Sequence, residues 1–408
     1  MPKPWRRGAL TRGTALKHVI VILDGAAGWP LSELGGRTTL AAANTPHLDA
    51  LAYAGCIGLA QTVPEGSEPS SSAACTAILG YDPVASFVGR GAIEAASMGI
   101  TLAPDEVALR MNLVNIAGGT MASYACGHIT TPESRAIVAE LGEALGDETF
   151  RFYPGVAYRH ILVIKGHTDL MNAGFTPPHD ISDKPIHGQT PRGAGAEILI
   201  DLMAGARELL ASSPANAARA AAGGLPATDI WPFWPGVAPA GLRPFSETYG
   251  VSAAITSGVD LLNGLAVLLD IERLDIPGVS DGADNDYAAQ AEGGLAALDD
   301  HDLVVIHVES PDEEGHAGDM EGKIAAIEAI DREVISRVRD YSGEVRILCM
   351  PDHPTPIALK THVGEAVPFV LAGPGVEPSR ATGFNEAAAG ATGIRVDPGF
   401  GVMRMLLG

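Results

Sequence analysis

The sequence predicts an α/β fold in which a mainly parallel sheet is sandwiched between helices. Short apolar runs rich in β-branched residues recur along the chain, and stretches of helical periodicity lie between them. Continuous apolar strands that alternate with helices are typical of a parallel sheet covered on both faces. We expect strands at residues 19–23, 303–308, 345–349 and 368–371.

Polar residues directly follow the first three of these runs. Asp24 follows the first run, residues 309–316 follow the second, and Asp352 and His353 follow the third. Ligands of such sheets bind at the carboxyl ends of the strands. The sequence therefore predicts the functional site at this edge of the sheet.

The middle of the chain differs in amino-acid composition from its two ends. It contains an alanine-rich segment at 211–224, which we interpret as an ordinary surface helix and its loop, and an aromatic and proline-rich segment at 231–235. We predict a smaller inserted α+β domain at 111–244, within a discontinuous core of 1–110 and 245–408. The cleft between the two domains is the expected active site.

The bulk composition excludes several classes of protein. With 408 residues, of which 46% are hydrophobic, the chain can bury a large core. The mean hydropathy is +0.16, yet no run approaches the roughly 18 to 20 apolar residues of a membrane span. The basic start, residues 1–14, precedes an apolar run of only strand length that ends at Asp24, so we expect no signal peptide and a cytoplasmic location.

The cysteine count and the net charge limit the kinds of bond, metal site and binding partner that we expect for this chain. The four cysteines have no paired spacing, which argues against disulfides and a thiolate zinc site, and we expect them to be reduced and mostly buried. A net charge of −22 excludes nucleic acid and anionic membranes as favoured partners. An anionic ligand would need a local reversal of this field, which bound divalent cations would provide. The sequence does not decide between a monomer and a homo-oligomer.

Six potential metal ligands fall at the expected strand ends or in adjoining loops. They are Asp24, Asp312, His316, Asp352, His353 and His362. Each pair alone is weak, because an aspartate and a histidine four apart are also common on solvated helix faces. Burying all six without a cation would be very costly, so we predict two divalent ions. The mixture of carboxylate and imidazole suits Mn²⁺ or Zn²⁺, with Mg²⁺ less natural.

A serine cluster, Ser70-Ser71-Ser72, precedes the apolar stretch that ends at Leu79. Such a cluster is as typical of a helix N-cap, with additional hydroxyls that have no catalytic role, as it is of a catalytic site. A serine at a helix N-terminus is also well placed as a nucleophile, because exposed N–H groups favour an anion there and a metal lowers the hydroxyl pKa.

Several motifs occur together in a fixed order along nearly the whole chain. They are Ile22-Leu23-Asp24-Gly25, Asn44-Thr45-Pro46 with Leu48-Asp49, Leu79-Gly80-Tyr81-Asp82-Pro83, Gly89-Arg90-Gly91 with Glu94-Ala95, Pro177-Pro178-His179-Asp180, residues 312–316, and Asp352-His353. In this the chain resembles the archaeal-type, cofactor-independent phosphoglycerate mutases of the alkaline phosphatase superfamily. The resemblance implies an alkaline-phosphatase-like core, a small phosphorylated acid as substrate and no bisphosphoglycerate cofactor.

The resemblance also implies roles for individual residues. One metal would be held by Asp24, Ser71, Asp352 and His353, and the other by Asp312, His316 and His362. Ser71 would be the nucleophile, and His179 or Asp180 would serve as acid and base. The substrate would be bound by Arg90, Arg110, Arg159 and His160. Each arginine taken singly could equally be a structural ion pair.

The sequence departs from the family pattern at two places, and these departures leave open that the substrate differs from that of the family. The family usually reads Gly-Ser-Asp with a histidine four residues after the serine, and this chain has Ser70-Ser71-Ser72 with Cys75. Alignment back from Leu79 selects Ser71, with Ser70 and Ser72 as the other choices. Asn263 stands where the family commonly has a lysine.

Three hypotheses follow. The first is phosphoglycerate isomerisation through a phosphoserine. The second is a related metal-dependent phosphotransferase or phosphatase, including a proposed homoserine kinase role; Ser72, Cys75 and Asn263 favour it, although the chain has no G-x-x-x-x-G-K loop. The third is a catalytically silent metal-binding protein that keeps the fold.

Overall fold

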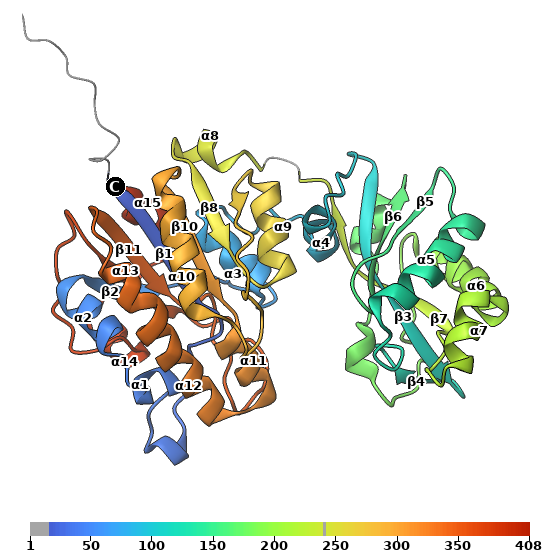
Figure 1. The fold of residues 1–408 in the computed structure, drawn as a ribbon, viewed down its shortest axis with the longest axis horizontal. Coiled ribbons are helices and arrows are strands. Elements are labelled where there is room, and N and C mark those ends of the chain that lie inside the picture. Colours follow the sequence, from blue (N-terminus) through green and yellow to red (C-terminus); the bar gives the residue numbers. More distant parts are fainter. Residues whose placement is uncertain (1–15, 240–241) are drawn as a thin grey trace, which may run out of the picture. The chain divides into compact units, whose positions relative to one another are not determined.

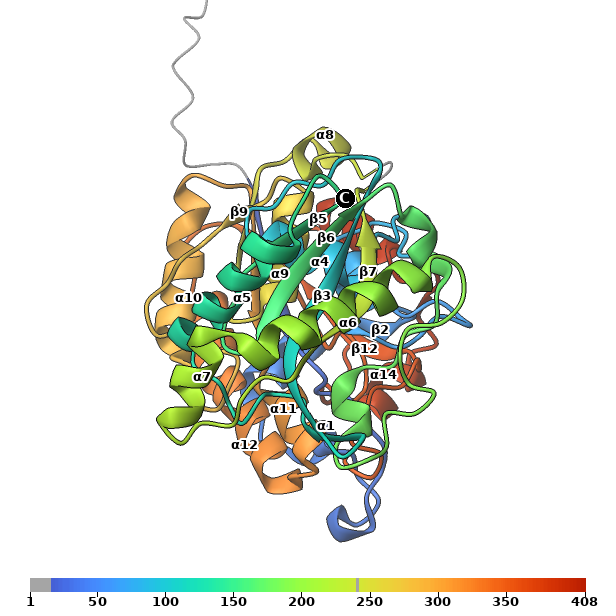
Figure 2. The same cartoon turned by 90° about the vertical axis from the view of Figure 1, so that its right-hand side faces the viewer.

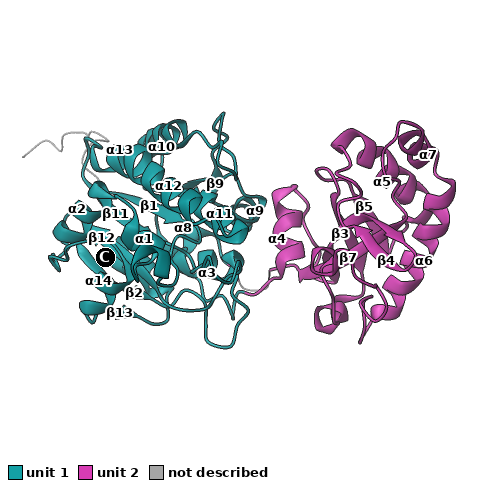
Figure 3. Ribbon diagram, turned by 90° about the horizontal axis from the view of Figure 1, so that it is seen from below, with its two compact units in different colours: residues 1–86, 243–408 teal, residues 87–242 magenta. Residues whose placement is uncertain are grey.

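The chain forms two compact units in a computed structural model that describes residues 16–239 and 242–408. The first unit combines the chain up to Ser86 with Arg243–Gly408, and the second is Phe87–Leu242 (Figure 3). The basic segment 1–14 lies outside the described residues. Within the described residues, no helix is long and apolar enough to span a membrane.

The second unit begins earlier than the sequence indicated. The predicted boundary after residue 110 falls inside strand β3 (Glu106–Ala117). Helix α4 (Arg90–Ser97) packs on β3 and on β7 (Asp229–Val237), so it belongs with the inserted unit. A short alanine-rich helix carries no mark in its sequence of the sheet on which it will pack.

The first unit is built on an eight-stranded sheet. In sheet order its strands are β13 (Arg395–Val396), β2 (Cys56–Ala60), β12 (Val367–Ala372), β11 (Val345–Met350), β1 (Lys17–Leu23), β10 (Leu303–Val308), β8 (Ala253–Thr256) and β9 (Glu272–Arg273). Strand β1 is parallel to β10 and β11, and β8 is parallel to β10 and β9. The predicted α/β fold with a largely parallel sheet is confirmed, and all four expected strands are present.

The fourth expected strand departs from the parallel pattern. Strand β12 runs antiparallel to both β11 and β2. A parallel neighbour requires a crossover, usually a helix, and the segment 351–366 between β11 and β12 contains none. That segment instead carries Asp352, His353 and His362.

Helices cover both faces of this sheet (Figure 1). One face carries α1 (Thr39–Ala42), α2 (Pro46–Ala54), α10 (Tyr287–Ala296), α12 (Met320–Ile330), α13 (Ser336–Arg339) and α14 (Glu386–Ala391). Their apolar residues pack with alternate residues of β1, namely Val19, Val21 and Leu23. On the other face lie α3 (Ser71–Ile78), α9 (Asp260–Leu268) and α15 (Gly401–Leu407), with α8 (Phe245–Tyr249) nearby. Helix α11 (Ser310–Ala317) directly follows β10.

The second unit is an antiparallel sheet with helices on both faces (Figure 2). Strand β3 pairs with β4 (Thr120–Ser123), β6 (Arg159–Lys165) and β7, and β5 (Phe150–Tyr153) pairs with β6. Ala108, Ile161 and Val163 pack towards α4. The alternate residues of β3 and β6 contribute to the core beneath α5 (Thr131–Leu145) and α6 (Ala196–Ser212), which α7 (Pro214–Ala221) follows. The alanine-rich segment forms the end of α6, α7 and a loop, as expected.

Candidate metal centre and substrate residues

Three loops meet at the carboxyl edge of the central strands. Leu23 at the end of β1 pairs with Val308 at the end of β10, and Ile22 pairs with Met350 at the end of β11. This register brings Asp24, the start of α11 and the Asp352 loop together. Polar residues that are far apart in the sequence thus share one edge, where the sequence predicted the site.

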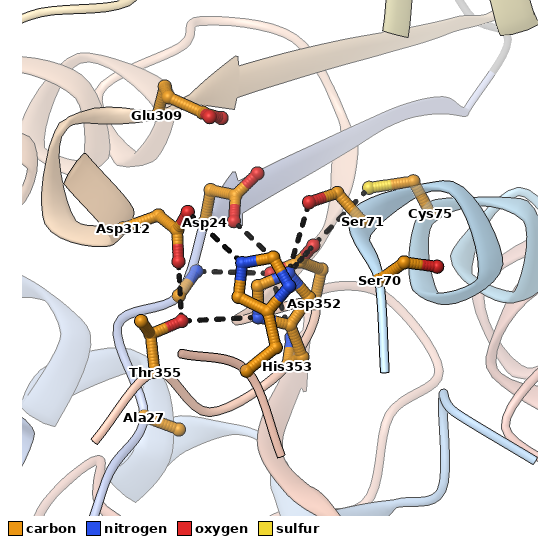
Figure 4. Close-up of polar contacts among 12 residues, drawn as sticks. Asp24, Ala27, Ser70, Ser71, Cys75, Glu309, Asp312, Asp352, His353 and Thr355 are labelled. Atoms are coloured by element: carbon orange, nitrogen blue, oxygen red, sulfur yellow. Dashed lines mark hydrogen bonds and ion pairs between the residues drawn. The ribbon is translucent and has the colours of Figure 1, made fainter. Parts of the chain in front are cut away.

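A first group of potential ligands lies beside the start of α3 (Figure 4). Ser71 Oγ lies 3.0 Å from His353 Nε2. The same nitrogen lies 3.1 Å from Asp352 Oδ2 and 3.7 Å from Asp24 Oδ1. Asp24, Asp352 and His353 are fully buried. All four residues of the first predicted metal site therefore lie together.

A second group of potential ligands lies beside the first. His316 Nε2 and His362 Nε2 are 2.9 Å apart, and they lie 3.1 and 3.4 Å from Asp312 Oδ2. Asp312 and His316 stand one helical turn apart in α11, as their spacing indicated. The rings of His353 and His362 lie 3.9 Å apart between centroids, so the two groups adjoin.

The donor atoms of both groups fit divalent cations. His316 Nδ1 lies 3.0 Å from the carbonyl oxygen of Lys360, so this nitrogen carries a proton and Nε2 can present its lone pair to an ion. Asp24 Oδ1 is buried and has no hydrogen-bond partner in the described part of the chain. Burial, and then the charges of Asp352 and Asp312, raise the pKa of Asp24 well above its usual range. A cation beside Asp24 would offset this burial and the repulsion from the neighbouring carboxylates.

Residues that the sequence did not single out hold these ligands in place. Thr355 Oγ1 donates a hydrogen bond to Asp312 Oδ1 and lies 3.3 Å from His353 Nδ1. The fully buried Lys323 donates from Nζ to the carbonyl oxygens of Ala27 and Thr355, and so ties two ligand-bearing loops together. Gly25 has a φ of +60°, and a Cβ there would collide with Asp312. A buried lysine or threonine looks like any surface residue in the sequence, so no signal could have found them.

The three serines occupy different positions at the start of α3. Ser70 is the N-cap, and its Oγ accepts a hydrogen bond from Ala73 N at 3.4 Å and lies 3.0 Å from Ser72 Oγ. Ser71 is the serine whose hydroxyl lies near His353. Cys75 Sγ lies 3.7 Å from Asp352 Oδ2, one turn further along the same helix. Capping and proximity to the ligands thus fall on adjacent residues.

The arginines of the second unit converge on one carboxylate. Glu94 Oε1 accepts hydrogen bonds from Arg90 Nε at 2.8 Å and from Arg110 Nη1 at 3.0 Å. The Arg90 guanidinium lies 4.1 Å from the centre of the Trp234 ring. Burial, together with the positive charges of Arg90 and Arg159, lowers the pKa of Arg110, so three guanidinium groups lie in one region. Neither Glu94 nor Trp234 was assigned a role from the sequence.

The remaining predicted substrate residues differ in exposure. His179, in the short helix Pro178–Ile181, is partly exposed, packs 5.5 Å from the Trp234 ring and has Nε2 3.7 Å from Asp180 Oδ1. Burial, and then the charges of Arg110 and Arg90, lower its pKa against the pull of Asp180. His160 is only 1% exposed, its Nδ1 accepts from Gly155 N at 3.1 Å, and burial lowers its pKa to about 3. His160 is therefore neutral at pH 7.

Comparisons with known proteins point in one direction. A family model for 2,3-bisphosphoglycerate-independent phosphoglycerate mutase matches residues 52–216. A probable enzyme of that name from Geobacter sulfurreducens is 42% identical over 402 residues, which cover 96% of this chain and 100% of that protein. Its namesake from Methanothrix thermoacetophila is 44% identical over 396 residues, with the same coverage. A solved structure of a Pyrococcus horikoshii protein is 27% identical, covers 97% of each chain and has a TM-score of 0.82.

Proposed function

The chain belongs to the 2,3-bisphosphoglycerate-independent phosphoglycerate mutases, and on that premise we propose that it exchanges the 3- and 2-phosphates of phosphoglycerate through Ser71 beside two divalent ions. The enzyme is an isomerase, and its relatives' names imply no bisphosphoglycerate cofactor. The alternative of another phosphotransferase or phosphatase gains no support from these relatives. The choice of Mn²⁺ or Zn²⁺ and a cytoplasmic location stay predictions.

One observation carries the proposal. A single serine hydroxyl lies 3.0 Å from a buried imidazole that is also within 3.7 Å of two buried carboxylates. Asp24, Ser71, Asp352 and His353 would hold one ion, and Asp312, His316 and His362 the other. Bound there, the ions would stabilise phosphoryl charge and lower the pKa of the Ser71 hydroxyl.

We propose that Ser71 acts as the nucleophile. Its Oγ enters the step without its proton, and it forms a bond to phosphorus as the bond from phosphorus to the 3-oxygen of the substrate breaks. His179 or Asp180 gives a proton to the departing oxygen. The 2-hydroxyl of the retained glycerate then attacks the phosphoserine, passes its proton back to the same residue and frees Ser71.

We assign recognition of the substrate carboxylate to the arginines of the second unit. A guanidinium binds a carboxylate through two parallel hydrogen bonds. Glu94 holds Arg90 and Arg110 on one carboxylate oxygen, and Arg159 adds a third positive charge. The surplus of positive charge suits an acidic substrate in a protein whose net charge is −22. His160, buried and neutral, would contribute through its Nε2, which is buried and has no hydrogen-bond partner in the described chain.

The test is to supply 3-phosphoglycerate with Mn²⁺ and to follow 2-phosphoglycerate and free phosphate together. We expect 2-phosphoglycerate to accumulate to equilibrium with little free phosphate, and without added bisphosphoglycerate. Release of phosphate without isomer would mean that water takes the phosphoryl group, and the mutase assignment would fail.

A further inference from the structure

A third cluster of potential ligands adjoins the two groups described above, and it shares Asp24 with the first. His307 Nε2 lies 2.7 Å from Asp24 Oδ2 and 3.7 Å from Glu309 Oε2. One donor atom from each residue lies within 4.8 Å of the other two. His307 belongs to β10, and Glu309 stands at the N-cap position of α11, so the same strand end that presents Asp312 also presents this cluster.

The cluster contains a buried carboxylate atom that has no hydrogen-bond partner among the described residues. The side chains of Asp24 and His307 have no exposed surface, and that of Glu309 is 12% exposed. Glu309 Oε2 is itself buried and has no hydrogen-bond partner among the described residues. A buried polar atom that is left unsatisfied destabilises the fold, and more so when the group is charged. A cation bound among the three side chains would remove this destabilisation.

The second ring nitrogen of His307 has a hydrogen-bond partner, as is common for histidines that bind metals. Its Nδ1 lies 3.0 Å from Ser257 Oγ, which accepts a hydrogen bond from Val259 N at 3.0 Å. Asn263 Nδ2 donates to the carbonyl oxygen of Ser257 at 3.3 Å and so fixes the same turn. Ligating histidines commonly donate their other ring N–H to such a partner, which turns the free lone pair towards the ion. With Nδ1 protonated, His307 Nε2 presents its lone pair to Asp24 and Glu309.

The two oxygens of Asp24 point to different neighbours. Oδ2 faces His307, whereas Oδ1 faces His353 at 3.7 Å. We propose that Asp24, His307 and Glu309 form a third divalent-cation site, in which Asp24 bridges this ion and an ion of the first group. One imidazole nitrogen and two carboxylate oxygens suit Mn²⁺ or Zn²⁺. Three protein donors leave coordination positions for water, as in an open site.

The competing arrangement places the ring proton on Nε2. His307 then donates directly to Asp24 Oδ2, and Glu309 takes up a proton instead of an ion. The two arrangements differ by one bound cation per chain, so an ion count separates them.

The experiment counts ions on the full chain. Metal-free protein is dialysed against Mn²⁺ up to millimolar concentration, and the bound metal per chain is measured by mass spectrometry. We expect the unchanged protein to hold one ion more than Glu309→Gln and one more than His307→Gln. Glu313→Gln, which removes a neighbouring charge on α11 but no atom of the cluster, should bind as many ions as the unchanged protein.

Equal counts in the unchanged protein and in both cluster variants would overturn the third site. The comparison is a difference of one ion, so it does not depend on whether the enzyme proves to be a mutase. Failure of the proposed function would appear separately, as absence of 2-phosphoglycerate in the assay described above.

Discussion

Ser71 and Ser70 divide the two roles that a serine at the start of a helix can have. Ser70 caps α3, and Ser71 places its hydroxyl beside His353. From the sequence, both readings stood at equal weight for the whole cluster. The difference between the residues arises from a rotation of about 100° per helical position, which a run of three serines cannot reveal.

Replacing Ser71 by alanine should abolish isomerisation, because Ser71 is the serine of the cluster whose hydroxyl lies beside His353. The ions should stay bound, since the other six predicted ligands remain. Initial rates of 2-phosphoglycerate formation and metal content check both expectations. Ser70→Ala is the matched control: it should keep the activity and lose about 0.5–2 kcal/mol of stability as a lost N-cap. Normal turnover in Ser71→Ala would show that the nucleophile lies elsewhere.

Glu94 is predicted to position Arg90 and Arg110. Glu94→Gln keeps the size of the side chain but removes the charge that orients two guanidinium groups. We expect kcat/KM for 3-phosphoglycerate to fall by about 10- to 100-fold, as misplaced binding groups commonly cause. Glu106→Gln, which disrupts the Arg151–Glu106 ion pair in the same unit, should leave kcat/KM nearly unchanged. Equal effects of the two substitutions would contradict a positioning role for Glu94.

At the scale of elements, β6 carries a buried histidine whose protonation opposes folding. The pKa of His160 is lowered by burial and by Arg110 to about 3, against 6.5 for an exposed histidine. Between these values the unfolded chain binds the proton and the folded chain does not, so stability falls as the pH falls below about 6.5. The slope from this residue is about 1.4 kcal/mol per pH unit.

Denaturant unfolding at pH 7, 6 and 5 checks this slope, followed by tryptophan fluorescence, to which Trp231 and Trp234 of the second unit contribute. His160→Gln should be less stable at pH 7 but should lose less stability than the unchanged protein between pH 6 and pH 5. Parallel pH profiles for the two proteins would mean that His160 is protonated in the fold.

The elements also show what the sequence could predict. Strands β1, β10 and β11 were found because they are mostly apolar and rich in β-branched residues, and their parallel direction followed from the alternation with helices. The direction of β12 was wrong because it depends on the connection, and the connection here is a ligand-bearing loop instead of a crossover helix. His307 was missed because it lies inside such an apolar run, where a single polar residue was the only signal.

At the scale of the whole molecule, the acidic chain must bind an acidic substrate. A net charge of −22 repels phosphoglycerate at long range, so binding needs local positive charge. The first unit would supply it through cations held by buried carboxylates, and the second through arginines grouped around Glu94. The sequence analysis predicted both the bound cations and the substrate-binding arginines. Their supporting residues, Thr355, Lys323 and Trp234, became visible only through tertiary contacts between distant segments.

The central claim is that seven donors from Asp24 to His362 hold two cations beside Ser71. The most direct measurement is a crystal structure of the Mn²⁺-loaded protein, with anomalous scattering recorded at the manganese edge. We expect one peak bonded to Asp24, Ser71, Asp352 and His353, and a second bonded to Asp312, His316 and His362. Loaded crystals with no anomalous peak at these residues, or with manganese bound only elsewhere, would contradict the account.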